Sequence, residues 1–401
     1  MKTLQRLSWF FRLLSAGLSA AYPLYLVQRD LASNDSSLIV ILSFNTILIY
    51  VVGLEMHVLS NRNVANGMNA LHVLNRIFRI EVIFIVFLFI VANFTNWGSK
   101  ESIETWKLVL LLVGTLGFQE LYRVLVVKQM ILFASSLLLF KTIVPILLTQ
   151  FFIISKFEKM AINSLYVLSV SILSLTCLGF GLITLSRDSI RQEERNGNCF
   201  SYKAILISGL LIFPHTMMLL ILMQYEVIFL SRLQDQRTIL WAGYQVTITS
   251  LLLLLQDVIT IQPLQKHMYT IKQAHPLINI KSYCLKNAVW CLLGLSLQFL
   301  TFHLISDKFI LELSASFILI QFVSMSLLIF YVAAFPIVLG MGLEKVFSLF
   351  SLVILAFVSC LHFFDISLDK LLLLKSVILC ICFIFTTLFF IRRSDYFKFD
   401  F

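Results

Sequence analysis

Ionisable side chains within long apolar stretches are the residues of this chain best placed to do chemistry. Lys141 lies in the middle of the apolar stretch 129–154, four residues before Pro145, which has no N–H to bond the Lys141 carbonyl. A cation at membrane depth is costly and usually faces water or a partner. Lys141 is therefore a candidate anion-binding residue. The alternatives are pairing with a glutamate or with carbonyl groups, or reaching out to the interface.

Three carboxylates near the ends of apolar stretches are candidates for binding a coupling proton or sodium ion. They are Glu55, Glu226 and Asp257. A carboxyl group in an apolar wall binds a proton more readily than one in water, which suits proton uptake. The alternative is ordinary solvation at the membrane surface. Glu120 and Arg123, three residues apart on one helix, are predicted to form a structural ion pair.

Prolines mark the apolar stretch that opens each half of the chain. Pro23 lies in the first stretch and Pro214 in the seventh, where His215 follows it. Interrupted helices at corresponding places in two halves indicate the central site of a transporter. His215 is a candidate for binding or gating, and the alternative is a hydrogen-bonded residue of the helix core.

The sequence contains no motif for covalent catalysis. The seven cysteines include no paired CxxC, and there is no HExxH, no phosphate-binding glycine loop and no Ser/His/Asp arrangement. We therefore expect no metal, no cofactor and no enzyme activity. No predicted outer loop is long enough for the large catalytic loop that is common in polysaccharide polymerases.

The apolar stretches themselves define the fold class. With 59% hydrophobic and 13% charged residues, the chain has about twelve stretches long enough to cross a bilayer as helices. We predict an all-α polytopic membrane protein whose first span is retained rather than cleaved as a signal peptide. The expected spans are 8–28, 37–59, 79–98, 106–127, 129–154, 163–185, 205–230, 238–262, 283–306, 316–339, 346–364 and 371–391.

The most polar segment divides the spans into two sets of six. It predicts an N-terminal six-helix bundle at 1–185, a cytoplasmic linker at 186–204 and a C-terminal six-helix bundle at 205–401. With both termini in the cytoplasm, roughly twice as many of the 31 Lys and Arg residues fall on the inner side as on the outer side, as the positive-inside rule requires. The net charge of +10 then reflects membrane topology, and we expect no nucleic-acid partner.

Several segments give the chain a family resemblance. They are Gly209–His215, Tyr225–Ser231, Trp241–Gln245, Tyr25–Leu31 and Ser60–Ala65. The chain resembles the O-antigen and polysaccharide flippases of the MOP exporter superfamily. These flippases likewise have a proline-bearing helix seven with an acidic residue near its outer end, and a Gly-Tyr element that opens helix eight. Here Val227 follows Glu226 where the family often has a basic residue.

The resemblance implies two six-helix bundles around a central cavity lined by helices 1, 2, 7 and 8. It implies transport of an undecaprenyl-diphosphate-linked oligosaccharide across the bacterial inner membrane, next to a polymerase and a chain-length regulator of the same pathway. The alternatives are an O-antigen polymerase and a small-molecule or drug exporter. The expected cargo-binding residues are Arg12, Tyr22, Asn45, Tyr50, Lys141, His215, Gln224, Tyr244 and Gln245, and the expected ion-coupling residues are Glu55, Glu226 and Asp257.

Overall fold

The computed structural model describes most of the chain's first half and parts of its second half. Almost all of the described residues are helical. The described residues are 2–28, 37–54, 56, 61, 63–64, 67–94, 105–155, 159–191, 201–230, 243, 246–249, 251–253, 256, 278–279, 285, 288–297, 299, 319–320, 323–329, 331–332, 344–361, 368–392 and 397–398.

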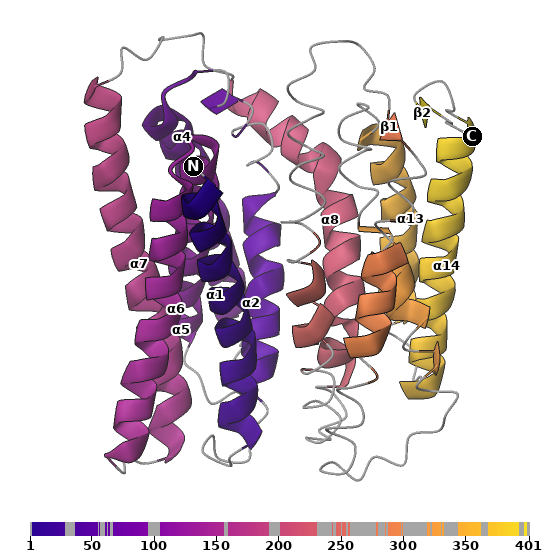
Figure 1. Cartoon of the computed structure of the whole chain (residues 1–401), viewed down its shortest axis with the longest axis horizontal. Helices are drawn as coiled ribbons and strands as arrows, with labels where there is room; N and C mark the ends of the chain where they lie inside the picture. The colour runs from indigo at the N-terminus through magenta and orange to yellow at the C-terminus, as the bar shows by residue number, and fades with distance from the viewer. Residues whose placement is uncertain are drawn as a thin grey trace. The chain divides into compact units, whose positions relative to one another are not determined.

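The long helices coincide with the apolar stretches expected from the sequence (Figure 1). In chain order they are α1 (Lys2–Gln28), α2 (Ser37–Gly53), α4 (Ala70–Phe94), α5 (Thr105–Val127), α6 (Ile131–Ile154), α7 (Lys159–Arg191), α8 (Tyr202–Leu230), α13 (Glu344–Leu361) and α14 (Leu368–Arg392). Two short strands, β1 (Ile278–Asn279) and β2 (Phe397–Lys398), pair in parallel. Helical pieces also fall within the expected spans 238–262, 283–306 and 316–339.

Several helices have the length and composition of membrane spans. A helix of about 20 apolar residues crosses the hydrocarbon core of a bilayer. Within the described residues, the four segments that meet this requirement are Trp106–Val127, Ile131–Ile154, Ile162–Arg187 and Tyr202–Gln224. The chain is therefore an all-α protein with the features of a membrane-embedded helical protein.

The chain folds as two compact units. The first comprises Met1–Leu220 and Gln224–Gly243, and the second comprises Ile221–Met223 and Tyr244–Phe401. The expected linker 186–204 overlaps the end of α7 and the start of α8, and its residues 192–200 lie outside the described part of the chain. The division into two six-helix bundles stays a prediction.

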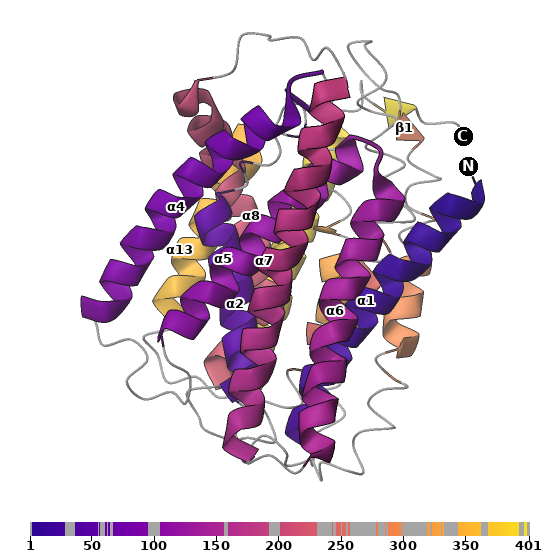
Figure 2. The ribbon, with the colours of Figure 1, turned by 90° about the vertical axis from the view of Figure 1, so that its left-hand side faces the viewer.

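Two pairs of parallel helices organise the first unit. α5 packs along α7 through small residues, because a Cβ atom on Gly114 would lie 2.8 Å from the carbonyl oxygen of Ser171. Further along the same interface, Gly117 and Gly181 pack against leucines of the facing helix. α1 packs along α6, and Figure 2 shows the two helices side by side. Small residues allow helix backbones to approach closely in a membrane, where there is no hydrophobic force between helices.

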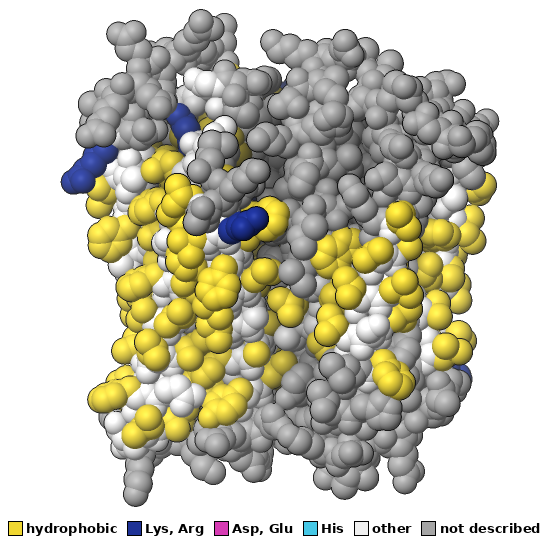
Figure 3. All heavy atoms as spheres, in the orientation of Figure 1, with side chains coloured by type: hydrophobic (Ala, Val, Ile, Leu, Met, Phe, Trp, Pro, Cys, Tyr) yellow, Lys and Arg dark blue, Asp and Glu magenta, His cyan; other side chains and the backbone are white. Residues whose placement is uncertain are grey.

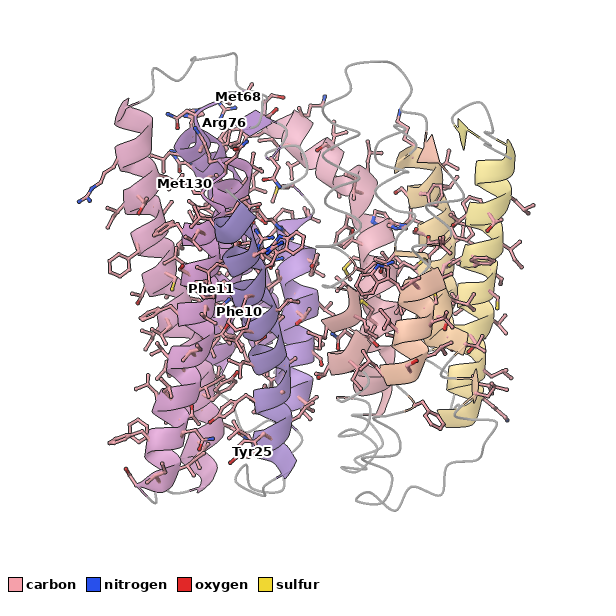
Figure 4. The ribbon with its side chains drawn as sticks, viewed as in Figure 1. Phe10, Phe11, Tyr25, Met68, Arg76 and Met130 are labelled. Carbon is pink, nitrogen blue, oxygen red and sulfur yellow. The ribbon has the colours of Figure 1, made fainter. Side chains whose placement is uncertain are left out.

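Successive helices of the first unit run in opposite directions, as expected of a chain that crosses a membrane repeatedly. Met68 precedes α4, and Met130 lies between α5 and α6. Both lie with Arg76 at one end of the unit, while Tyr25 lies at the other end (Figure 4). α4 and α6 therefore start at the end where α5 finishes. On the face that Figure 3 shows, the described surface between the two ends is largely apolar, as expected of a surface that faces lipid.

Candidate functional site

The interface between α1 and α6 carries a ladder of polar side chains. Ser8 Oγ lies 2.7 Å from Ser135 Oγ, and Ser15 Oγ lies 2.6 Å from Thr142 Oγ1. One step further along α1, the Tyr22 hydroxyl donates to the carbonyl oxygen of Ile146 at 3.5 Å. The two hydroxyl pairs are seven residues apart on each helix, which is the repeat that keeps two helices facing each other as they supercoil. The seven-residue spacing therefore keeps these polar groups at the interface between α1 and α6.

Arg12 is part of this ladder. It lies on α1 between Ser8 and Ser15, and only 5% of the residue is exposed. Its Nε donates to Ser135 Oγ at 3.3 Å. Ser135 in turn donates to the Ile131 carbonyl oxygen of its own helix at 2.8 Å, so its hydroxyl oxygen is the acceptor for Arg12. The buried guanidinium is thus held by a hydroxyl group whose own proton is already engaged.

Arg12 and Lys141 contact two neighbouring aromatic rings of α5. The Arg12 guanidinium carbon lies 5.5 Å from the centre of the Tyr122 ring, and Lys141 Nζ lies 4.6 Å from the centre of the Phe118 ring. The ring centres of Phe118 and Tyr122 are 6.2 Å apart. Each cation lies within the distance at which an aromatic ring attracts it. α1, α5 and α6 therefore bring the two expected basic residues to one aromatic pair.

Lys141 faces α5 and α7. It is half-buried on α6, with Phe118 of α5 beneath its ammonium group and an electrostatic interaction with Cys177 of α7. Among the described residues it makes no ion pair. The contact with an aromatic ring offsets part of the cost of burial without neutralising the charge. Pairing with a carboxylate, which the sequence left open, is thus not seen in the described part of the chain.

The other described candidates are distributed over α1, α2 and α8. The Tyr22 ring packs against Tyr25 and Tyr166, with ring centres 5.9 and 5.5 Å apart. Asn45 of α2 donates to Thr115 Oγ1 of α5 at 3.3 Å. Tyr50 is half-buried on α2, while His215 and Gln224 are buried on α8. Within the described residues, the amide oxygens of Asn45 and Gln224 have no hydrogen-bond partner.

Five predicted site residues fall wholly or partly outside the described structure. Glu55, Asp257, Tyr244 and Gln245 lie outside the described residues. Glu226 belongs to α8, but its side chain lies outside the described part. The ion-coupling roles of Glu55, Glu226 and Asp257 stay predictions.

A cluster of charged side chains on α4 and α5 was only partly expected from the sequence. The predicted pair of Glu120 and Arg123 is confirmed, with Nη1 donating to Oε1 at 2.6 Å. Glu81 of α4 interacts electrostatically with both residues. Glu81 was not among the expected site residues, although it lies within the expected span 79–98. α4 begins at Ala70, so Glu81 lies near the helix centre.

A sequence signal for the earlier start of α4 exists. Asn69 precedes the helix, and its side chain accepts a hydrogen bond from the backbone N–H of His72 at 3.1 Å. Asparagine is one of the residues preferred at this capping position. An Asn followed by the amphipathic run Ala70–Ile80 therefore marks a helix start that lies before the expected membrane span 79–98.

The described site residues are suited to binding an anion. Arg12 and Lys141 supply the positive charge that phosphate and carboxylate oxygens attract. The hydroxyl groups of the α1–α6 ladder already donate within the helix pair, so they hold the two helices together beside these cations. In the part of the chain that the structure describes, no group of three or more His, Cys, Asp or Glu side chains is placed to hold a metal ion. No family model and no curated protein matches this chain.

Proposed function

We propose that this chain is a flippase of the MOP exporter superfamily. In this proposal it carries an undecaprenyl-diphosphate-linked oligosaccharide from the cytoplasmic to the periplasmic leaflet of the bacterial inner membrane. A sugar-diphosphate headgroup cannot cross hydrocarbon unaided, because polar groups without hydrogen-bond partners are costly in lipid. A polar path within a helical bundle is therefore the minimum that such a protein must supply.

One observation carries the proposal. Arg12 and Lys141 lie on two neighbouring helices, in contact with the same aromatic pair, inside a unit whose described surface is largely apolar. Cations at membrane depth are rare and are usually retained for function. The hydroxyl groups of the α1–α6 ladder make the helix interface beside them polar. Positive charge on a polar interface matches the chemistry of a diphosphate.

The remaining parts of the proposal rest on the sequence. Twelve spans would form two six-helix bundles with both termini in the cytoplasm. An ion gradient or the membrane potential would drive alternating access, because the chain shows no motif for ATP hydrolysis. Membrane lipids would surround the protein, and the polymerase and chain-length regulator of the same pathway would act beside it. The polar residues expected along the sugar path are Tyr22, Asn45, Tyr50, His215, Gln224, Tyr244 and Gln245.

Deletion of the gene tests this function. We expect lipid-linked oligosaccharide to accumulate on the inner leaflet and a surface glycan to disappear, and expression of the intact chain should reverse both effects. Normal polymer on the deletion strain would contradict the proposal. Display of single unpolymerised repeat units would instead favour a polymerase, and an unchanged glycan with increased sensitivity to small toxic compounds would favour a drug exporter.

A further inference from the structure

The charged cluster on α4 and α5 contains two buried carboxyl groups. Glu81 is 3% exposed and Glu120 is 2% exposed. Arg123 binds Glu120 Oε1, while Glu120 Oε2 and Glu81 Oε1 have no hydrogen-bond partner within the described residues. Buried oxygens of this kind are uncommon, because leaving an acceptor unsatisfied is costly, and more so when the group is charged.

Within the described helices, Arg123 is the positive charge that faces Glu81. α4 packs against α2, α5 and α7. Among the described side chains of these helices, the ionisable groups that interact with Glu81 are Glu120 and Arg123. With both carboxyl groups ionised, the described cluster therefore has two negative charges and one positive charge. Burying an uncompensated charge inside a protein is strongly unfavourable.

The last turn of α2 adds to this imbalance. A Cβ atom built on Gly53, the final residue of α2, would lie 4.0 Å from Glu81 Oε1. The C-terminal end of a helix carries a partial negative charge and exposes carbonyl oxygens that lack intrahelical partners. Such an end repels a carboxylate but accepts a hydrogen bond from a protonated carboxyl group. Charge and hydrogen bonding therefore both favour a proton on this side of the cluster.

We propose that Glu81, Glu120 and Arg123 form a proton-binding site in which the two carboxyl groups hold one exchangeable proton. The shared proton lowers the net charge of the described cluster to zero and turns one unsatisfied oxygen into a donor. A proton fits the site better than a divalent metal ion, because a divalent ion needs more oxygen ligands than two carboxyl groups offer. The Arg123 side chain is 20% exposed, so the cluster reaches the surface of the protein on that side.

A coupling role for this site rests on the proposed function. If the chain moves its cargo by alternating access, release and uptake of this proton would link the cargo to the proton gradient. Proton binding itself does not depend on the identity of the cargo. The two statements can therefore fail separately, and the experiment has one arm for each.

The first arm measures protonated carboxyl groups directly in the purified full-length protein. Infrared difference spectra recorded across a pH titration separate the carbonyl stretch of a protonated carboxyl group from the bands of a carboxylate. We expect a pH-dependent carboxyl band in the wild-type protein that is lost in Glu81→Gln or in Glu120→Gln. The control, Glu344→Gln at the start of α13, should keep it. Absence of the band from the wild type, or its persistence in both cluster variants, would overturn the site.

Folding of the variants is controlled by a conservative change. Glu81→Asp keeps a carboxyl group, so it should shift the band without removing it, whereas a mere packing defect would remove it. The second arm measures transport of lipid-linked oligosaccharide in vesicles with and without a pH gradient. Loss of the band with unchanged gradient dependence would end the coupling role and leave the proton site intact. No transport by the wild type would contradict the proposed function alone.

Discussion

Lys141 Nζ lies 4.6 Å from the centre of the Phe118 ring, on the side of α6 that faces α5 and α7. One turn further along α5, Tyr122 holds Arg12 in the same way. Aromatic rings attract cations through their quadrupole but leave the charge in place. A cation that contacts an aromatic ring keeps its charge and stays able to attract an anion. This relationship is the basis of the anion-binding role that we assign to Lys141.

Replacement of Lys141 tests that role. Lys141→Ala should reduce glycan display about tenfold or more at an unchanged protein level, since a hydrogen bond to a charged group contributes about 1.5–3 kcal/mol. Lys141→Arg should retain part of the activity, because charge matters more than geometry for a mobile diphosphate. Surface glycan and membrane protein level should be measured together.

Lys141→Met separates anion binding from packing. Methionine is an unbranched apolar side chain of similar length that can keep the contact with Phe118 without the cost of burying a charge. Full glycan display by this variant at native expression would rule out the anion-binding role, while loss of display with normal protein level would support it.

The hydroxyl pair at the α1–α6 interface should contribute a measurable coupling energy. Ser15→Ala, Thr142→Ala and the double variant form a cycle around the 2.6 Å hydrogen bond. We expect a coupling of about 0.6 kcal/mol, and at most about 1.7 kcal/mol, from values for helix pairs in membranes. Ser136→Ala is the matched control, because Ser136 is exposed and bonds its own helix at Leu132. A coupling of zero in thermal unfolding of the solubilised protein would show that this contact is absent.

Close packing of α5 on α7 predicts a sharp difference between two glycines. A Cβ atom on Gly114 would lie 2.8 Å from the carbonyl oxygen of Ser171, whereas Gly179 has nothing within 4 Å. Gly114→Ala should lower the unfolding temperature, with a cost of about 1–3 kcal/mol for overpacking. Gly179→Ala should be neutral or slightly stabilising, because alanine favours a helix by about 1 kcal/mol over glycine. Equal unfolding temperatures for the two variants would contradict the packing.

Single cysteines on either side of α6 test the topology. Gln129 and Ser155 are both exposed and flank the helix. If both termini are cytoplasmic, a thiol reagent that cannot cross the membrane should label Ser155→Cys in whole cells and label Gln129→Cys only after lysis. The parent chain, labelled in parallel, controls for the native cysteines. Labelling of Gln129→Cys in whole cells would show that the chain has the opposite orientation in the membrane. A periplasm-dependent reporter fused after Phe401 should likewise stay inactive.

Hydropathy predicted the helices well because burial in lipid selects composition along the whole span. The structure places long helices on the expected stretches of the first half, and the spacing of Glu120 and Arg123 was sufficient to predict their pair. The polar residues of the α1–α6 ladder recur every seven positions in each helix, and this period is visible in the sequence. The sequence near Ser15 does not show, however, that Ser15 faces Thr142. That pairing joins residues 127 positions apart and depends on how the helices pack.

The burial of Glu81 could not be predicted from hydropathy. Arg76 and Arg79 lower the hydropathy at the start of α4, so the stretch chosen by hydropathy, 79–98, begins after the helix itself begins at Ala70. Helix formation depends on capping by Asn69 and on an amphipathic face rather than on mean hydropathy. Hydropathy alone therefore does not show that Glu81 lies near the middle of a helix and is buried within the protein.

Movement of a lipid-linked oligosaccharide between leaflets can be measured directly. The purified full-length protein is placed in liposomes whose undecaprenyl-diphosphate-linked oligosaccharide is labelled on the sugar, and protection of that sugar from an enzyme added outside is followed over time. We predict that the accessible fraction changes faster with the protein than in protein-free liposomes, and that Lys141→Ala slows this change. A rate equal to that of protein-free liposomes, with correctly folded protein, would contradict the flippase function.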